Sequence, residues 1–586
     1  MEVFSLLRKL LRFLKPDRAE SVLGPLFKML EALFELFIPL VVADIVDVGI
    51  LGGGGSSYIL QRCGIMVLLG VIGLVCSITA QYFSAKAAVG MAAGMRRALF
   101  AHIGKLSYAE TDRIGTATLL SRTTADVNQI QTTVNMVLRL FLRSPFIVFG
   151  AMIMAFTVSP RAALTFVVTI PLLSIVIFGI MLVSIPLFRR VQGKLDRILG
   201  LTRENLKGAR VVRAFVREEE SVEEFTAANR ELTALQRFTG RFSALLNPLT
   251  YVIINLAILA IIYLGGVQVN LGNLGTGDVI ALYNYMSQIL VELIKMANFI
   301  ILITKACACA TRVNEVFDTP IGMKKSDIPS PQKSAEIQGA VTFRNVSLSY
   351  HQNGESALSR ISFDAPAGST VGIIGGTGSG KSSLVNLIPR LYDASEGAVL
   401  IDGTDVRAYD PPERLREQIG IVPQKAELFA GTVRENLQWG NGTASDEALW
   451  EALDAAQASF IKDKEGGLDF KIEQGGRNLS GGQRQRLTVA RALARRPRIL
   501  ILDDSASALD FATDAALRRS LSELAYRPTT FIVSQRTASM MHADLIVVLD
   551  DGEAIDKGTH KELLERCAVY REIYESQFKQ EGGAAQ

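Results

Sequence analysis

The first half of the chain is dominated by apolar stretches that are long enough to cross a lipid bilayer. They lie near residues 22–47, 59–83, 136–157, 162–187, 245–269 and 279–304. A helix of about 20 residues spans about 30 Å of hydrocarbon, so each stretch is long enough to be a transmembrane helix. Short loops join the stretches in pairs, and longer polar segments near 84–135 and 188–244 join one pair to the next. The pattern predicts a membrane domain of six transmembrane helices.

Ionisable residues occur inside these stretches. The first contains Lys28, Glu31, Glu35 and Asp44, and the sixth contains Glu292 and Lys295. A charge at the centre of a bilayer costs about 3 kcal/mol, so these side chains are expected to face a wet cavity or each other. Glu292 and Lys295 are three residues apart and can pair on one helix face. Two roles stay open, lining a translocation pathway or adjusting helix packing.

Basic residues predict the orientation of the membrane domain. The three short loops contain one cation, Arg161, whereas lysines and arginines recur throughout residues 189–241. Cytoplasmic segments are enriched in such residues, so the long polar segments and both termini are expected in the cytoplasm. The sequence of these polar segments indicates helices. We therefore expect the transmembrane helices to continue through them beyond the bilayer.

The stretch Leu6–Leu14 contains Arg8, Lys9 and Arg12, so it lacks the clean apolar core of a signal peptide. It predicts an amphipathic elbow helix on the membrane surface. A mitochondrial transit peptide is the weaker alternative, because the segment is poor in serine.

After about residue 318 the chain resembles ordinary soluble α/β sequence. Residues 319–336 contain Pro and Lys and predict a linker. Short apolar or alternating runs then predict strands at Val341–Leu348, Thr370–Ile374, Ile419–Val422, Ile499–Leu502, Thr530–Val533 and Leu545–Leu549. Helical stretches alternate with these runs, which predicts a sheet with helices on both faces. We therefore expect a membrane domain at 1–318 and an α/β domain at 337–586.

Composition narrows the class of protein. Of 586 residues, 49% are hydrophobic and 20% are charged, which excludes a disordered chain or a small disulfide scaffold. The net charge of +4 and the lack of a basic block give no indication of nucleic acid binding. The five cysteines form no CxxC pair, and Cys307 with Cys309 is a poor metal site without a nearby histidine. Reduced, buried thiols on the cytoplasmic side are the better interpretation.

The strongest local motif follows the predicted strand Thr370–Ile374. It fits G-x-x-x-x-G-K-[ST] and consists of Gly375, Gly376, Thr377, Gly378, Ser379, Gly380, Lys381 and Ser382. A helix is expected from Ser383 to Leu391. Glycines allow backbone N–H groups to surround phosphates, and the helix N-terminus adds a favourable field. We expect Lys381 to reach the β- and γ-phosphates of a nucleotide and Ser382 to bind Mg²⁺.

Two further motifs support a nucleotide site. The strand Ile499–Leu502 is followed by Asp503, a second expected Mg²⁺ residue. Between the two strand motifs lies Leu479-Ser-Gly-Gly-Gln, in which Ser480, Gly481, Gly482 and Gln483 begin a helix. Backbone donors at a helix N-terminus suit a phosphate.

Together these motifs resemble an ATP-binding cassette (ABC) half-transporter of the exporter type, and the resemblance covers nearly the whole chain. It implies six transmembrane helices fused to one α/β P-loop nucleotide-binding domain that uses ATP and Mg²⁺. It also implies that Tyr350 stacks on adenine, and that Gln424 senses Mg²⁺ and contacts the membrane domain. A loop ending in Asp510 and coupling regions near 115–130 and 205–215 complete the pattern.

The sequence departs from that family at two catalytic positions. Asp504 stands where the family has the glutamate that activates water, and Gln535 stands where it has the switch histidine. Shortening the carboxylate by one methylene withdraws it by about 1.5 Å, and such displacements can cost orders of magnitude in rate. Glutamine can donate a hydrogen bond but cannot transfer a proton as histidine does. The signature Ser480–Gln483 is intact, so the resemblance implies an asymmetric heterodimer with a partner that carries the consensus Glu and His.

The function expected from the sequence is ATP-driven export of an amphiphilic drug, lipid or peptide across the cell membrane, with hydrolysis mainly at the composite site formed with the partner. The alternative is a regulator or channel gated by nucleotide. An importer ATPase subunit and a soluble ABC protein are excluded by the fused transmembrane segments. A multidrug substrate range is an analogy with the family, and the motifs do not identify the substrate.

Overall fold

The computed structural model describes residues 12–321, 323, 337–350, 355–409, 412–505 and 508–578. The chain forms two compact units: Met1–Lys105 with Ile114–Pro320, and Leu106–Arg113 with Ile321–Gln586. Most of the predicted elbow helix and most of the predicted linker lie outside the described residues.

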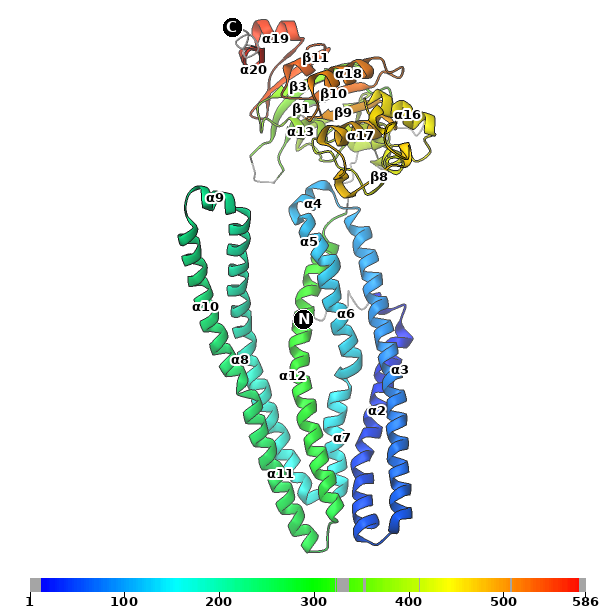
Figure 1. The fold of residues 1–586 in the computed structure, drawn as a ribbon, viewed down its shortest axis with the longest axis vertical. Helices are drawn as coiled ribbons and strands as arrows, with labels where there is room; N and C mark the ends of the chain where they lie inside the picture. The colour runs from blue at the N-terminus through cyan, green and yellow to red at the C-terminus, as the bar shows by residue number, and fades with distance from the viewer. Residues whose placement is uncertain are drawn as a thin grey trace. The chain divides into compact units, whose positions relative to one another are not determined.

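Long helices running side by side make up the first unit (Figure 1). Its longer helices are α2 (Arg18–Asp44), α3 (Gly55–Ile103), α6 (Val127–Met136), α7 (Arg143–Val158), α8 (Pro160–Lys207), α10 (Glu218–Ala244), α11 (Leu246–Asn270) and α12 (Thr276–Asp318). Short helical elements connect them, including α5 (Thr116–Ser121), α9 (Ala209–Ala214) and the π-helical turns η2 (Ile45–Leu51), η3 (Arg122–Asp126) and η4 (Val137–Phe141).

Five continuous helical segments of the described residues are long and apolar enough to cross a membrane. They are Gly55–Ile103, Thr116–Val158, Pro160–Lys207, Glu218–Asn270 and Thr276–Asp318. The sixth expected span is the 27-residue helix α2, which carries too many charges to be counted with them.

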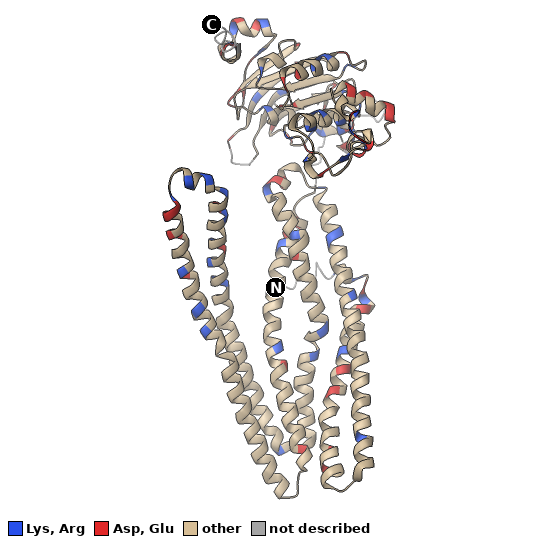
Figure 2. Ribbon diagram, viewed as in Figure 1, with Lys and Arg blue, Asp and Glu red and all other residues tan. Residues whose placement is uncertain are grey.

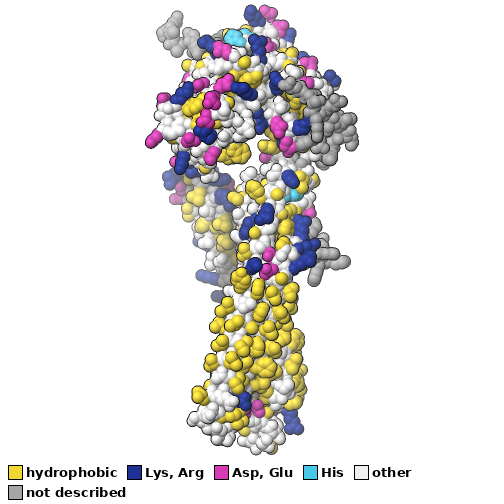
Figure 3. Space-filling model, turned by 90° about the vertical axis from the view of Figure 1, so that its right-hand side faces the viewer, with side chains coloured by type: hydrophobic (Ala, Val, Ile, Leu, Met, Phe, Trp, Pro, Cys, Tyr) yellow, Lys and Arg dark blue, Asp and Glu magenta, His cyan; other side chains and the backbone are white. Residues whose placement is uncertain are grey.

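Apolar side chains such as Leu60, Val168 and Ile175 are 75%, 69% and 70% exposed. Exposure of this kind is stable only against lipid, and Figure 3 shows the corresponding hydrophobic belt on the helical unit.

The helices continue far beyond the apolar belt, as expected from the sequence. The 49 residues of α3 extend about 70 Å at 1.5 Å per residue, more than twice the hydrocarbon thickness. Figure 2 shows basic residues along the ends of α8 and α10 and on α9. The cytoplasmic location of these extensions stays a prediction from their basic residues.

Close packing brings α2 and the start of α12 together. A side chain at Gly277 would place its Cβ 2.2 Å from the carbonyl oxygen of Ala43, so only glycine fits there. The backbone N–H of Gly277 donates to Asp47 Oδ1 at 2.7 Å, and the buried Tyr285 hydroxyl donates to the carbonyl of Leu36 at 2.7 Å. These contacts fix the register in which the charged residues of α2 and α12 face each other.

The second unit contains a six-stranded sheet of order β12-β11-β3-β10-β9-β6. The strands β3 (Thr370–Gly375), β6 (Ile419–Val422), β9 (Ile499–Asp503), β10 (Thr529–Val533) and β11 (Leu545–Asp550) are parallel, and β12 (Glu553–Gly558) is antiparallel to β11. All of the predicted strands are present, within one residue at each end.

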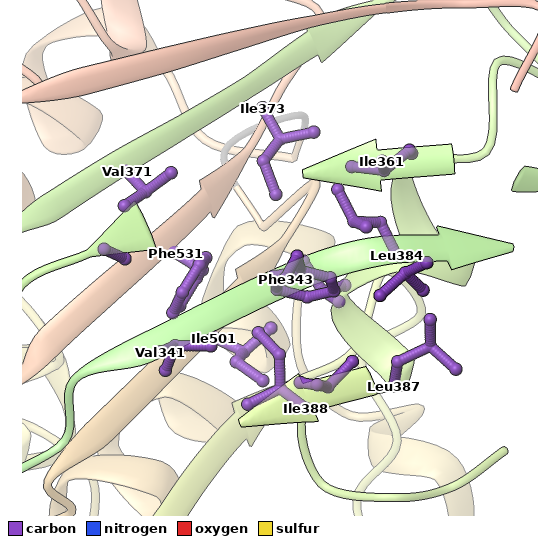
Figure 4. Packing of buried hydrophobic residues seen from close by; sticks show 14 of the residues in the cluster. Val341, Phe343, Ile361, Val371, Ile373, Leu384, Leu387, Ile388, Ile501 and Phe531 are labelled. Carbon is purple, nitrogen blue, oxygen red and sulfur yellow. The ribbon is translucent and has the colours of Figure 1, made fainter. Parts of the chain in front are cut away.

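The prediction of helices on both faces of this sheet is incomplete for one face. Helix α13 (Lys381–Asn386) covers part of that face, and an antiparallel sheet of order β2-β1-β4-β5 packs there as well, formed by β1 (Val341–Leu348), β2 (Leu358–Ala365), β4 (Glu396–Ile401) and β5 (Thr404–Asp405). Phe343 of β1, Phe531 of β10 and Leu384 of α13 meet in the core between the layers (Figure 4). Polar residues in β2 and β4 hide their strand character, so only β1 of this sheet was predicted.

The opposite face follows the prediction. Helices α15 (Val433–Gln438), α16 (Asp446–Ala455), α17 (Gly481–Leu493) and α18 (Phe511–Ser522) supply its core, and α19 (His560–Arg566) and α20 (Ala568–Phe578) cover Ile374, Ile546 and Val548. Short elements fill the connections: α14 (Glu413–Arg416), β7 (Gly431–Thr432) and β8 (Lys471–Ile472).

Candidate nucleotide-binding site

The strand order brings the predicted motifs to one edge of the parallel sheet. Strand β10 lies between β3 and β9, and β6 follows β9. The carboxyl ends of parallel strands meet at the same edge. Lys381 follows β3, Gln535 follows β10, Asp503 ends β9 and Gln424 follows β6, so residues more than 150 positions apart in sequence converge there.

Backbone conformation explains the glycines of the loop after β3. Gly378 and Gly380 have φ of +87° and +89°, which other residues adopt only with strain. Gly380 is the N-cap of α13, which begins at Lys381 and ends at Asn386. The helix expected at Ser383–Leu391 therefore begins earlier and is shorter. The backbone continues in tighter i to i+3 turns as it approaches Pro389, before which an α-helix is disfavoured.

Lys381 is folded back onto its own loop. Its ammonium donates to the carbonyl of Gly375 at 3.0 Å and also to the carbonyl of Gly376. Burial lowers the pKa of Lys381, and the carboxylates of Asp504 and Asp503 oppose that effect. A cation held beside a glycine-rich loop is suited to a polyphosphate.

Ser382 and Asp503 provide the candidate metal site. The Ser382 hydroxyl donates to Asp503 Oδ1 at 3.0 Å. Asp503 is 8% exposed, and burial raises the pKa of its carboxyl, against the hydrogen bond from Ser382. Hydroxyl and carboxylate oxygens are the ligands that Mg²⁺ prefers, so this donor set fits the ion.

Asp504 and Gln424 lie next to this pair. Asp504 has a left-handed backbone, with φ of +47°, and its N–H donates to the carbonyl of Val533 at 3.0 Å. Gln424 Nε2 donates to Asp504 Oδ2 at 3.4 Å. The backbone carbonyl of Gln535 accepts from Gln577 Nε2 at 2.8 Å, which anchors the loop after β10. Both residues that depart from the family pattern are thus held at the site.

One cavity of about 340 Å³ joins these groups. Its lining includes the predicted residues Tyr350, Thr377, Gly378, Gly380, Lys381, Ser382, Ser383, Gln424, Asp503, Asp504 and Gln535. The Tyr350 hydroxyl donates to Ser383 Oγ at 2.8 Å, which places its ring at the mouth of the loop. The cavity has the aromatic, cationic and carboxylate groups that a Mg²⁺ nucleotide requires.

The signature residues stand apart from this cavity. Ser480 caps α17: its hydroxyl accepts from the Gln483 N–H at 3.3 Å, and Gln483 Oε1 accepts from the Ser480 N–H at 3.0 Å. Gly481 is exposed, and a Cβ there would meet nothing within 4 Å. Neither these residues, nor Gly482, nor Asp510 line the cavity of about 340 Å³. Asp510 caps α18, and hydrogen bonds from Thr513 lower the pKa of its carboxyl. Ser507, in the loop that ends at Asp510, lies outside the described residues.

Sequence reasoning missed two residues around the cavity. Ser534, 1% exposed, lines it directly after β10. Tyr392 packs edge-on against Tyr350, with ring centroids 5.1 Å apart. Burial and a hydrogen bond to Asp112 raise the pKa of Tyr392. No local motif marks Tyr392, because its contact with Tyr350 spans 42 positions of the sequence.

The coupling role expected for residues 115–130 stays a prediction. These residues belong to the helical unit, whereas Leu106–Arg113 belongs to the nucleotide unit. Within that unit, Tyr392 donates to Asp112 Oδ2 at 2.7 Å. Helix α4 (Tyr108–Ile114) is short and polar, so hydrophobic periodicity gave no signal for it.

The described part of the chain contains no cluster of three or more metal-binding His, Cys, Asp or Glu side chains. The Sγ atom of Cys309 accepts from Nη2 of Arg312 at 3.2 Å. Cys76, Cys309 and Cys567 are buried as expected, whereas Cys63 and Cys307 are partly exposed.

A helical membrane unit joined to a P-loop domain with these motifs defines a membrane transport ATPase. Residues 21–293 match the family described as ABC transporter transmembrane region, and residues 358–507 match the family described as ABC transporter. The chain belongs to the ABC transporter family and is an exporter-type fusion of a membrane domain and an ATP-binding domain. Its ATPase activity is therefore coupled to transport across a membrane.

Relatives cover the full fusion. The chain is 38% identical over 579 residues to an uncharacterized ABC transporter ATP-binding protein of Mycobacterium tuberculosis, covering 98% of each. It is 33% identical over 483 residues to an ATP-dependent lipid A-core flippase of Desulfotalea psychrophila, covering 82% of this chain and 84% of the relative. A solved bacterial Atm1-family ABC exporter with ATP bound has a TM-score of 0.80 and 24% identity, covering 96% of this chain and 99% of that structure, and shows the fold.

Proposed function

We propose that this chain is one half of an asymmetric heterodimeric exporter that moves an amphiphilic or hydrophobic substrate across the cell membrane. The observation that carries the proposal is the pairing of Asp504 and Gln535, both at the nucleotide cavity, with an intact signature that lies outside it. The flippase among the relatives acts, by its name, on lipid A-core, which supports an amphiphilic substrate.

The residues of the cavity have distinct proposed roles. Tyr350 stacks on adenine, the loop from Gly375 to Ser383 surrounds the phosphates, and Lys381 pairs with their charge. Ser382, Asp503 and Gln424 hold Mg²⁺, which neutralises phosphate charge when bound.

In this proposal the membrane domain covers residues 1–318, a linker follows at 319–336, and the ATP-binding domain begins at 337. Both termini and the ATP-binding domain lie in the cytoplasm.

The same cavity is poorly equipped to hydrolyse ATP. A general base must reach the attacking water with its carboxylate, and Asp504 is one methylene shorter than the family's glutamate. Its Oδ2 also accepts from Gln424, which draws it towards the metal residues. Gln535 can donate a hydrogen bond to a γ-phosphate but transfers no proton. ATP held here is expected to turn over slowly.

The signature then serves the partner's site. Ser480 and the N-terminus of α17 present exposed polar groups, which suits a phosphate held by the other subunit. A partner with consensus Glu and His would supply the base and the switch. The heterodimer therefore has one fast composite site, and this chain contributes its signature to it.

Purification of this chain alone in lipid tests the proposal. We expect ATPase activity at least about 100-fold below that of the co-expressed pair, because both sites of a homodimer would lack the glutamate and the histidine. Hydrolysis is measured as phosphate release at saturating ATP and Mg²⁺. Nucleotide binding by the isolated chain is the control for folding. Robust hydrolysis by the homodimer would overturn the asymmetric assignment.

Lengthening the carboxylate alone is expected to have little effect. Asp504→Glu in the co-expressed pair should change ATPase activity by less than about twofold, since Gln535 still cannot act as the switch. The double variant Asp504→Glu with Gln535→His is the matched comparison and should raise the rate further. A several-fold gain from Asp504→Glu by itself would show that the glutamine is no obstacle.

A further inference from the structure

A chain of charged contacts crosses the interior of the membrane unit from α12 to α2. The Lys295 ammonium donates to Glu292 Oε1 at 2.8 Å, as its spacing predicted. Arg143 of α7 bridges two carboxylates, donating to Glu292 Oε1 at 2.6 Å and to Glu35 Oε2 at 2.6 Å. Ser144 donates to the other oxygen of Glu292 at 2.6 Å. The order along the chain is therefore cation, anion, cation, anion.

The inner and outer members of this chain differ in exposure. The side chains of Arg143 and Glu292 are 8% and 4% exposed, so they neutralise each other inside the protein. Those of Lys295 and Glu35 are 43% and 38% exposed. Each outer group shares its charge with only one inner neighbour. The chain of contacts thus ends in an accessible ammonium on α12 and an accessible carboxylate on α2.

Both ends line the same cavity of about 520 Å³. Asn284, Ser287 and Gln288 of α12 add polar groups, and Ile38, Val42 and Ile147 add an apolar wall. Gln288 Oε1 has no hydrogen-bond partner among the described residues although it is shielded from water, so the cavity offers an unused acceptor. Buried polar atoms are normally satisfied, and an unused one in a cavity indicates a place for a ligand group.

We propose that this cavity binds the headgroup of a zwitterionic amphiphile, with the ligand's ammonium at Glu35 and its anionic group at Lys295. The assignment rests on the proposed export function and names its substrate class. A purely cationic headgroup would leave the accessible Lys295 ammonium with only the carboxylate of Glu292, which Lys295 shares with Arg143. A purely anionic headgroup would leave the accessible Glu35 carboxylate with only the guanidinium of Arg143, which Glu35 shares with Glu292. Only a headgroup that carries both charges can pair with both Glu35 and Lys295. The acyl chains of such a lipid match the apolar wall of the cavity.

Charge-specific variants test this assignment. Lys295→Gln leaves Arg143 with two glutamates, so the site becomes net negative and should prefer a cationic headgroup. Glu35→Gln leaves Arg143 and Lys295 with Glu292, so it should prefer an anionic one. Lys305→Gln is the matched control, because Lys305 is exposed on the same helix and lies outside the cavity.

The probes are three lipids with identical fluorescent acyl chains and different headgroups: phosphoethanolamine, phosphoglycerol and trimethylammonium. Their binding to the assembled transporter is measured without ATP by fluorescence anisotropy in maltoside micelles. The wild type and Lys305→Gln should bind the phosphoethanolamine lipid about tenfold more tightly than the other two, the gain from one additional charge-assisted hydrogen bond. Each cavity variant should lose that preference by a similar factor. The affinity should shift towards the trimethylammonium lipid in Lys295→Gln and towards the phosphoglycerol lipid in Glu35→Gln.

Transport of the same probes in proteoliposomes separates the two proposals. Equal binding of all three headgroups by the wild type, or an equal loss for all three in both variants, would overturn the zwitterion site while leaving an ATP-driven pump intact. The expected binding order without any ATP-dependent movement of the probes would uphold the site and overturn the export function.

Discussion

Gly481→Asp in this chain is expected to lower the ATPase activity of the assembled transporter by at least about 100-fold, the cost of losing a major phosphate-stabilising interaction. The substitution does not disturb the fold, because a Cβ at this position meets nothing within 4 Å. An acidic residue in the first turn of α17 even favours the helix by about 0.3–1 kcal/mol. The same charge would repel the phosphates that the helix N-terminus is proposed to receive. Phosphate release by the purified pair measures the loss.

The matched variant is Lys381→Ala in the same chain. Lys381 lies at this chain's own cavity, where Asp504 and Gln535 are proposed to slow hydrolysis, so its loss is expected to reduce turnover by less than about tenfold. Equal melting temperatures would show that both variants are folded. If Gly481→Asp retained most of the activity, the composite site would be wrong. If Lys381→Ala were as severe as Gly481→Asp, the two sites would be equivalent and the chain would not be degenerate.

The sequence was sufficient to predict which residues meet at the cavity wherever a residue's position is set by its own strand and loop. Lys381 comes after β3 and its glycine loop, and Asp503 ends β9, so the local context placed both residues at the carboxyl ends of strands. The hydrogen bond from Ser382 to Asp503 joins two of these predicted positions. The placement of β10 between β3 and β9 could not be read from any one segment, because strand order depends on packing between distant parts of the chain.

Contacts between elements explain what the sequence could not predict in either unit. Strands β2 and β4 carry polar residues and were missed, although they complete the second layer of the core. Arg143 begins α7 inside the predicted stretch 136–157 and was not recognised as a buried ion-pair residue. Its partners lie 108 and 149 positions away in sequence, so helix spacing revealed the pair Glu292–Lys295 but not the bridge that joins it to Glu35.

Removing that bridge is expected to destabilise the membrane unit. Arg143→Met retains an unbranched apolar stem but leaves the carboxylates of Glu35 and Glu292 without their shared guanidinium. Breaking a buried ion pair from one side costs about 3–5 kcal/mol, and the Lys295 ammonium that remains on the buried Glu292 offsets part of that cost. The transporter should therefore melt at a lower temperature, measured with a thiol-reactive dye that reports exposure of the buried Cys76 and Cys309. Lys295→Gln, whose side chain is 43% exposed, should change the melting temperature much less. Adding Glu292→Gln to Arg143→Met removes one of the two carboxylates that have lost the guanidinium, so the double variant should regain part of the stability. If Arg143→Met alone melted at the same temperature as the wild type, the bridge would contribute little to stability.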